Sequence, residues 1–143
     1  MAAVSPELVP GLHGDTSITV GNEHTAPHVG SGRVRVLATP VMINLLEAAA
    51  LAAVERCLPD GQQTVGTHLD VKHFAATPVG MAVIAHAELT KVEGRTLTFR
   101  VWAEDAVEPI SEGTHERIII TLTRFDERMQ KKQAGEPSVK VKR

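Results

Sequence analysis

The sequence predicts an α+β domain in which one long, buried helix packs against an antiparallel sheet. Residues 41–58 are nearly all helix formers, and apolar side chains lie on almost every side of the helix that they would form. This pattern is typical of a helix that is buried rather than one that lies on a surface. After this run the chain alternates with a period of two, which indicates strands joined by short turns.

The segment before the helix predicts a leader, one strand and a loop. Residues 1–15 carry Pro and Gly without periodicity, so we expect a flexible leader there. Thr16–Val20 (TSITV) is rich in β-formers and predicts a short strand. Residues 21–32 contain many turn formers, and Arg33–Leu37 alternates as a short strand or the stem of a loop would.

The ends of the helix carry residues that favour helix boundaries. Thr39 suits the N-cap and Pro40 suits the first helical position. Pro59-Asp60-Gly61 ends the run. The few polar positions fall near one stripe of the helix: Asn44, Glu47 and Glu55.

Four strands are expected after the helix. They span residues 64–75, 81–93, 96–105 and 113–125. The tight turn Glu93-Gly94-Arg95 joins the second and third as a hairpin. One helix that covers one face of an antiparallel sheet is the hotdog arrangement. We place this domain at residues 16–126, followed by a charged C-terminal tail at 127–143.

The composition argues against several classes of protein. A net charge of −2, with three Phe, one Trp and no Tyr, argues against nucleic-acid and membrane partners. The single cysteine, Cys57, excludes an internal disulfide and favours a reducing compartment. The N-terminus lacks a secretory signal pattern, and the apolar run at 41–54 is shorter than a membrane span. We therefore expect a cytoplasmic protein.

His73 is the first candidate for chemistry. In the strand 64–75, Leu69, Val71 and His73 point to one side, while His68, Asp70 and Lys72 form a water-facing row on the other. A histidine at the end of an apolar row, just before a turn, is either a core histidine with a local partner or a pocket residue.

Glu47 and Thr39 are further candidates with two interpretations each. Glu47 lies among apolar helix residues, so it is either buried with a hydrogen-bond donor or placed on a solvated stripe with Asn44. Thr39 is either a plain N-cap or part of a helix N-terminus that receives a thioester carbonyl. A hydroxyl, a carboxylate and an imidazole together would make a hydrolytic site.

The other histidines carry weaker signals. His24 and His28 lie in a Gly/Pro loop, where we expect no metal site, and solvent exposure explains His86 on the outward face of its strand. His115 and Arg117 lie in a charged segment that is either a solvated strand end, which we favour, or a recognition patch for nucleotide phosphates. Gly-rich phosphate loops and the GxSxG and HExxH motifs are missing, and we expect no cofactor.

Ordered blocks over about residues 16–125 resemble the fluoroacetyl-CoA thioesterase family of hotdog proteins. The blocks are Ala38-Thr39, the helix with Met42, Leu46 and Glu47, Val65-Gly66-Thr67, residues 71–80 (VKHFAATPVG), residues 92–95 (VEGR) and residues 113–117 (GTHER). The resemblance implies a hydrolase that cleaves acyl-CoA to free acid and coenzyme A. It also implies a homodimer with each active site near the subunit interface.

The family's functional residues fall on positions of this chain. The resemblance implies Thr39, Glu47 and His73 as the catalytic group and Gly66 as a substrate-recognition residue, and Arg117 is our further candidate for binding the substrate. The fluoroacetyl-specific enzyme carries phenylalanines in the loop before the threonine, whereas His28–Arg35 holds no aromatic residue. We therefore expect a different or broader acyl group.

Two alternatives to hydrolysis remain open from the sequence. One is a hotdog hydratase or dehydratase acting on an enoyl-CoA, although residues 60–66 lack a clear Asp/His version of that site. The other is a non-catalytic module that binds acyl-CoA.

Overall fold

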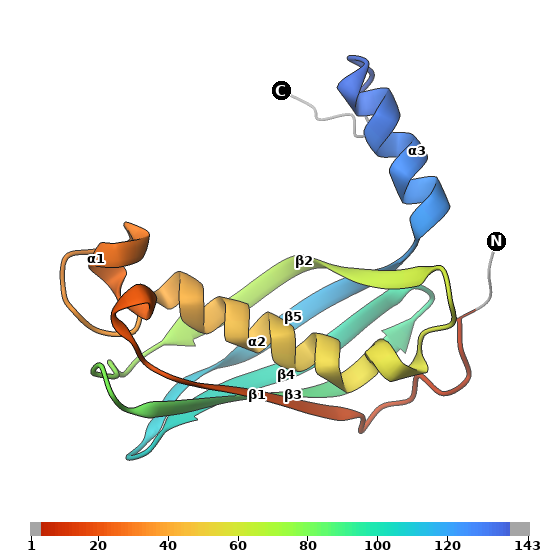
Figure 1. Ribbon diagram of the computed structural model, residues 1–143. Coiled ribbons are helices and arrows are strands. Elements are labelled where there is room, and N and C mark those ends of the chain that lie inside the picture. Colours follow the sequence, from red (N-terminus) through yellow and green to blue (C-terminus); the bar gives the residue numbers. More distant parts are fainter. Residues whose placement is uncertain (1–3, 138–143) are drawn as a thin grey trace.

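The computed structural model describes residues 4–137, which form a five-stranded antiparallel sheet with one long helix lying across it (Figure 1). The strands are β1 (His13–Thr19), β2 (Gln62–His73), β3 (Ala82–Glu93), β4 (Thr96–Asp105) and β5 (Pro109–Thr121). The helices are α1 (Ala26–Val29), α2 (Thr39–Val54) and α3 (Leu122–Gln133), with 3-10 turns η1 (Asn22–His24) and η2 (Glu55–Cys57). The predicted α+β arrangement is confirmed.

The order of strands across the sheet is β1-β3-β4-β5-β2, so β1 and β2 are its two edges. The β3–β4 hairpin pairs Glu93 with Thr96 around Gly94 and Arg95, as predicted. Helix α2 lies over β1 and β3 and leaves β2 largely uncovered. The edge that β2 forms is therefore open both along its backbone and on its helix-facing side.

Helix α2 approaches the sheet closely because small residues meet where they touch. A Cβ added to Gly14 on β1 would lie 2.2 Å from the carbonyl oxygen of Ala49 and 2.5 Å from the backbone nitrogen of Ala53. On β3, the alanines at 85 and 87 are fully buried beneath the same helix. Larger side chains fill the core around this contact: Met42, Leu46, Leu89, Leu97, Phe99 and Ile119.

Strand β2 changes register against β5 between Gly66 and His68. Gly66 lies opposite Arg117, while Leu69 lies opposite His115, so one extra residue sits on β2. Side chains alternate across a strand, and a bulge of one residue reverses that alternation. Gly66 and His73 therefore point to the same face of the sheet, the face on which α2 lies, although one residue number is even and the other is odd.

Several strand boundaries differ from the prediction. Strand β1 begins at His13, and Leu8, only 5% exposed, packs in the core, so part of the expected leader belongs to the folded body. Strand β5 begins at Pro109 and ends at Thr121. Helix α3 replaces the predicted end of that strand and continues through residues 127–133 of the expected tail. Residues 1–3 and 138–143 lie outside the described part.

The loop before α2 is shaped by two bridges rather than by a strand. Leu37 pairs with Thr25, and Val36 pairs with Pro78, so residues 33–37 form the stem of a loop.

Helix α3 projects away from the sheet, as Figure 1 shows. Within residues 4–137, no helix is both long and apolar enough to cross a membrane.

Substituting Gly14 should destabilise the protein, because a methyl group there meets the backbone of α2. We expect Gly14→Ala to lower the free energy of unfolding by about 1–3 kcal/mol, as overpacking does in tight cores. Urea denaturation followed by circular dichroism measures this. The matched control is Gly32→Ala, whose new methyl would lie 3.4 Å from the Cβ of Ala26, an ordinary contact. Equal stabilities for the two variants would contradict the tight contact between β1 and α2.

Candidate active site

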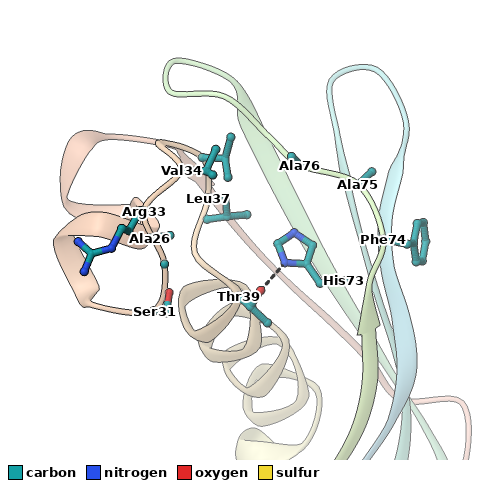
Figure 2. Close-up of a pocket in the computed structure, with 12 residues that line it drawn as sticks. Ala26, Ser31, Arg33, Val34, Leu37, Thr39, His73, Phe74, Ala75 and Ala76 are labelled. Atoms are coloured by element: carbon teal, nitrogen blue, oxygen red, sulfur yellow. Dashed lines mark hydrogen bonds between the residues drawn. The ribbon is translucent and has the colours of Figure 1, made fainter.

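Thr39 and His73 meet at the N-terminal end of α2. The helix is capped by Ala38, so Thr39 is its first residue rather than the N-cap that the sequence predicted. Its hydroxyl lies 2.8 Å from Nδ1 of His73. Figure 2 shows this bond crossing from the helix to the end of β2. The shift of one residue at the helix start therefore leaves the hydroxyl available to the histidine.

Burial favours the neutral form of the His73 imidazole. It lowers the pKa of His73 below the ordinary value of 6.5, because partly apolar surroundings disfavour the charged ring, while the backbone at Ala75 opposes this effect. The second ring nitrogen, Nε2, is buried and has no hydrogen-bond partner among residues 4–137. A neutral imidazole bonded to a hydroxyl is the arrangement that general acid–base catalysis requires.

The pair opens into a pocket of about 330 Å³. Its walls come from the loop before α2, from the start of α2 and from the chain after β2. Val34 and Leu37 contribute apolar surface, whereas Phe74, although it borders the pocket, turns its ring away from His73 (Figure 2). The loop residues 26–37 that border the pocket include no aromatic side chain. The pocket is thus polar at Thr39, His73 and Arg33, and Val34 and Leu37 give it aliphatic surface.

A second group of polar residues surrounds Glu47. Arg117 on β5 donates from Nη1 to Oε2 of Glu47 at 3.4 Å and from Nε to Oγ1 of Thr64 at 2.9 Å. His115 donates from Nδ1 to the carbonyl of His68 at 2.8 Å, which leaves its Nε2, 3.2 Å from Nη1 of Arg117, as an acceptor. The guanidinium is held on several sides, and it directs the Glu47 carboxylate towards β2.

Gly66 lies directly against this carboxylate. A Cβ at Gly66 would come within 2.6 Å of Oε2 of Glu47 and 3.4 Å of Nη1 of Arg117. The missing side chain therefore makes room for the carboxylate. Glu47 retains 36% exposure of its side chain, so the position next to Gly66 is open to a ligand.

The structure brings together some predicted site residues and separates others. Thr39 and His73 form one group, and Glu47, Gly66 and Arg117 form another. Eight residues of α2 separate Thr39 from Glu47, a distance of about 12 Å along the helix axis. Glu47 lies on the partly solvated stripe that was one of its two interpretations, but there it is paired with an arginine.

The interpretation of residues 113–117 as a solvated strand end was wrong. His115 is fully buried and Arg117 is 6% exposed, both on the side of β5 that faces α2. Both faces of the strand carry polar residues in this segment, so the alternation of side chains did not indicate which face is buried. Thr64, whose hydroxyl and carbonyl both accept hydrogen bonds from Arg117, carries no signal in the sequence that marks it as a site residue.

The fold and this site define a hotdog thioesterase. A solved thioesterase superfamily member from Thermus thermophilus superposes with a TM-score of 0.81 at 25% sequence identity, covering 90% of this chain and 98% of the other. A hot-dog-like protein from Thermanaerovibrio acidaminovorans superposes with a TM-score of 0.79 at 19% identity. The long helix across a curled five-stranded sheet is the arrangement that these proteins share.

The chain belongs to the fluoroacetyl-CoA-specific thioesterase family, whose model matches residues 20–123. The fluoroacetyl-CoA thioesterase of Streptantibioticus cattleyicolor is 44% identical over 97 residues, covering 68% of this chain and 70% of that enzyme. A solved structure of the fluoroacetyl-CoA thioesterase FlK matches with a TM-score of 0.82 at 36% identity, covering 87% of this chain and 97% of the other. The protein is therefore a thioesterase that hydrolyses acyl-CoA thioesters, which decides against hydration and against a binding module without activity.

The lowered pKa of His73 predicts a shift of its titration towards acid. Because the neutral form is favoured, protonation should require a pH below 6.5, and any activity that depends on the neutral ring should persist to that pH and fall below it. NMR titration of the ring should give a midpoint under 6.5, and the acid limb of kcat/KM should follow it. A midpoint above 6.5 would contradict the effect of burial.

Proposed function

We propose that Thr39 and His73 of one subunit, with Glu47 of a second copy, hydrolyse the acyl-CoA thioester. The observation that carries the proposal is the hydrogen bond between Thr39 and the half-buried His73 at the mouth of a pocket. The Thr39 hydroxyl and the N-terminus of α2 receive the thioester carbonyl oxygen, which gains negative charge in the transition state. His73 transfers protons, and the Glu47 carboxylate either attacks the carbonyl carbon or orients a water molecule.

A second copy is proposed because one chain leaves the site incomplete. Thr39 and Glu47 are about 12 Å apart along α2, too far to act on one carbonyl group. Strand β2 is an edge strand of the sheet that residues 4–137 form, and one side of its backbone is open. On its helix-facing side Leu69 and Val71 are only partly buried, and Leu51 on α2 is partly exposed as well. An edge with half-covered apolar residues is suited to pair with a second copy of itself.

The spacing of residues on β2 fits such a pairing. Where two identical strands pair antiparallel without a bulge, the sequence numbers of opposite residues add up to a constant. Opposite residues must also point to the same face, so a two-fold axis at Asp70 pairs Leu69 with Val71 of the partner subunit. The extra residue at the register shift of β2 then places Gly66 of the partner subunit opposite His73. Since Glu47 lies against Gly66, the partner's carboxylate would then enter the pocket beside Thr39 and His73. The same axis builds two identical sites.

Mixed dimers test the shared site directly. His73→Ala and Glu47→Gln should each lower kcat by ~10²-fold or more, as expected for single acid–base groups. When the two variants are co-expressed with different tags and the mixed dimer is purified, one of its two sites contains both native residues. We expect that dimer to recover about half of the native rate in a thiol-release assay with acyl-CoA.

A second mixed dimer serves as the control. When His73→Ala is paired with Thr39→Ala, each of the two sites carries one defect, so this dimer should stay inactive. Recovery in the first dimer then cannot come from the mixing of subunits alone. A site built within one chain leaves the His73→Ala/Glu47→Gln dimer inactive as well, and that result would contradict the proposal. Circular dichroism and size-exclusion chromatography establish that each variant folds and assembles.

We also propose that the acyl pocket is less selective than that of a fluoroacetyl-specific enzyme. Solved relatives hold fluoroacetate with CoA, and acetyl-CoA. In this chain the loop over the pocket presents Val34, 70% exposed, and residues 26–37 offer no aromatic side chain to close it. An open loop without aromatic side chains can accommodate a longer acyl chain. We propose a cytoplasmic site of action, in keeping with the free thiol of Cys57.

A panel of substrates tests this pocket. The kcat/KM values for fluoroacetyl-, acetyl- and butyryl-CoA should agree within about 200-fold, because an apolar pocket discriminates such small changes by only about 1–3 kcal/mol, or roughly 10–200-fold. Val34→Phe should reduce the rate with butyryl-CoA more than the rate with acetyl-CoA. Val107→Phe, at an exposed position away from the pocket, is the matched control. A native preference for fluoroacetyl-CoA above roughly 200-fold, more than such a pocket provides, would overturn the proposal.

A further inference from the structure

The outer face of the sheet, opposite α2, carries a cluster of histidine and carboxylate groups that the hydrolytic site does not use. His13 and Asp15 lie two residues apart on β1 and so point to the same side. His86 on β3 lies directly opposite Asp15 in the pairing of the two strands. Solvent exposure alone does not explain His86, because both of its ring nitrogens are engaged by carboxylates.

The ligand atoms of these residues converge on one point. Oδ1 of Asp15 lies 2.7 Å from Nε2 of His13 and 2.5 Å from Nδ1 of His86. Within residues 4–137, this is the one group of three histidine, cysteine or carboxylate residues whose ligand atoms all lie within 4.8 Å of one another. Ligands of a tetrahedral Zn²⁺ at about 2.0–2.1 Å are about 3.3 Å apart, so a modest rotation of these exposed side chains would accommodate the ion.

His86 is oriented for this role by its neighbours. Its Nε2 donates to Oε1 of Glu104 at 2.9 Å, and its Nδ1 donates to Asp15 when the ring is protonated. Loss of the Nδ1 proton leaves a lone pair directed at the ion, while Nε2 stays bonded to Glu104. A carboxylate that accepts the second N–H of a histidine is the usual support of a histidine that binds metal. The ring also stacks on Trp102, at 5.2 Å and 18°, and Arg100 covers the same indole. His86 is the least exposed of the three, at 18% of its side chain.

We propose that His13, Asp15 and His86 form a binding site for Zn²⁺ on the outer face of the sheet, with Glu104 as the residue that orients His86. Two imidazoles and one carboxylate suit Zn²⁺, whereas Mg²⁺ and Ca²⁺ favour oxygen ligands. Glu88, opposite His13 in the pairing of β1 with β3, adds a further negative charge nearby. The ligands come from two paired strands, which hold side chains more rigidly than loops do. Bound Zn²⁺ would fasten the edge strand β1 to β3.

Calorimetry with the full-length chain tests the proposal. The protein is prepared without a histidine tag, treated with a chelator and titrated with ZnCl₂. We expect one Zn²⁺ per chain with a micromolar or lower Kd, and a rise in the melting temperature that grows with Zn²⁺ concentration because the ion binds the folded state. His86→Gln and His13→Gln should each weaken binding at least ~10-fold, and Glu104→Gln should weaken it by about 10-fold. Thioesterase activity of these variants should stay native, since their side chains face away from α2.

The matched control is His28→Gln, which removes an exposed histidine from the loop that also carries His24. It should bind Zn²⁺ as the native chain does. Binding that is lost in His28→Gln but kept in His86→Gln would identify an adventitious loop site and overturn the proposal. The proposal is also overturned if the native chain binds no Zn²⁺ at micromolar concentrations. Because the readouts are Zn²⁺ affinity and melting temperature, they do not depend on the residues proposed for hydrolysis.

Discussion

The extra residue in β2 determines which of its side chains lie on the face of the sheet that meets α2. Beyond the register shift, Leu69, Val71 and His73 face α2, and before it Thr64 and Gly66 do so. Without the shift, one of these two sets would lie on the outer face of the sheet, since side chains alternate strictly along a regular strand. The meeting of His73 with Thr39, and that of Gly66 with Glu47, both depend on this one irregularity. A single bulge thus positions both groups of polar residues.

Much of the fold could be predicted because the pattern of residues was locally consistent. The long apolar helix, the hairpin at Gly94 and the parity of the second half of β2 each follow from spacing alone. The bulge could not be predicted, because no side chain in residues 66–68 distinguishes it. Helix α3 was missed for a related reason, because Leu122 and Phe125 were assigned to the preceding strand and the charged residues after them resemble a tail.

The candidate site, like the fold, could be predicted from the sequence only in part. Strand parity placed His73 correctly, and the stripe on α2 placed Glu47 at the partly exposed edge of the helix. The buried pair of His115 and Arg117 depends on contacts between β5, β2 and α2, which are far apart in the sequence. Thr39 shows how a small shift matters. As an N-cap its hydroxyl would have been bonded to the helix, whereas as the first helical residue it is free for His73.

The two edges of the sheet are unequal, and this difference has a consequence for assembly. Strand β1 is seven residues long and presents His13 and Asp15 beside its free edge, whereas β2 is twelve residues long. A contact of β2 with β1 of another copy would be heterologous and would extend without limit, as in a fibre, whereas a contact of β2 with itself is closed by symmetry. Short, charged edges resist pairing with other strands. In the proposed dimer the sheet therefore grows on one side only, and growth stops after one step.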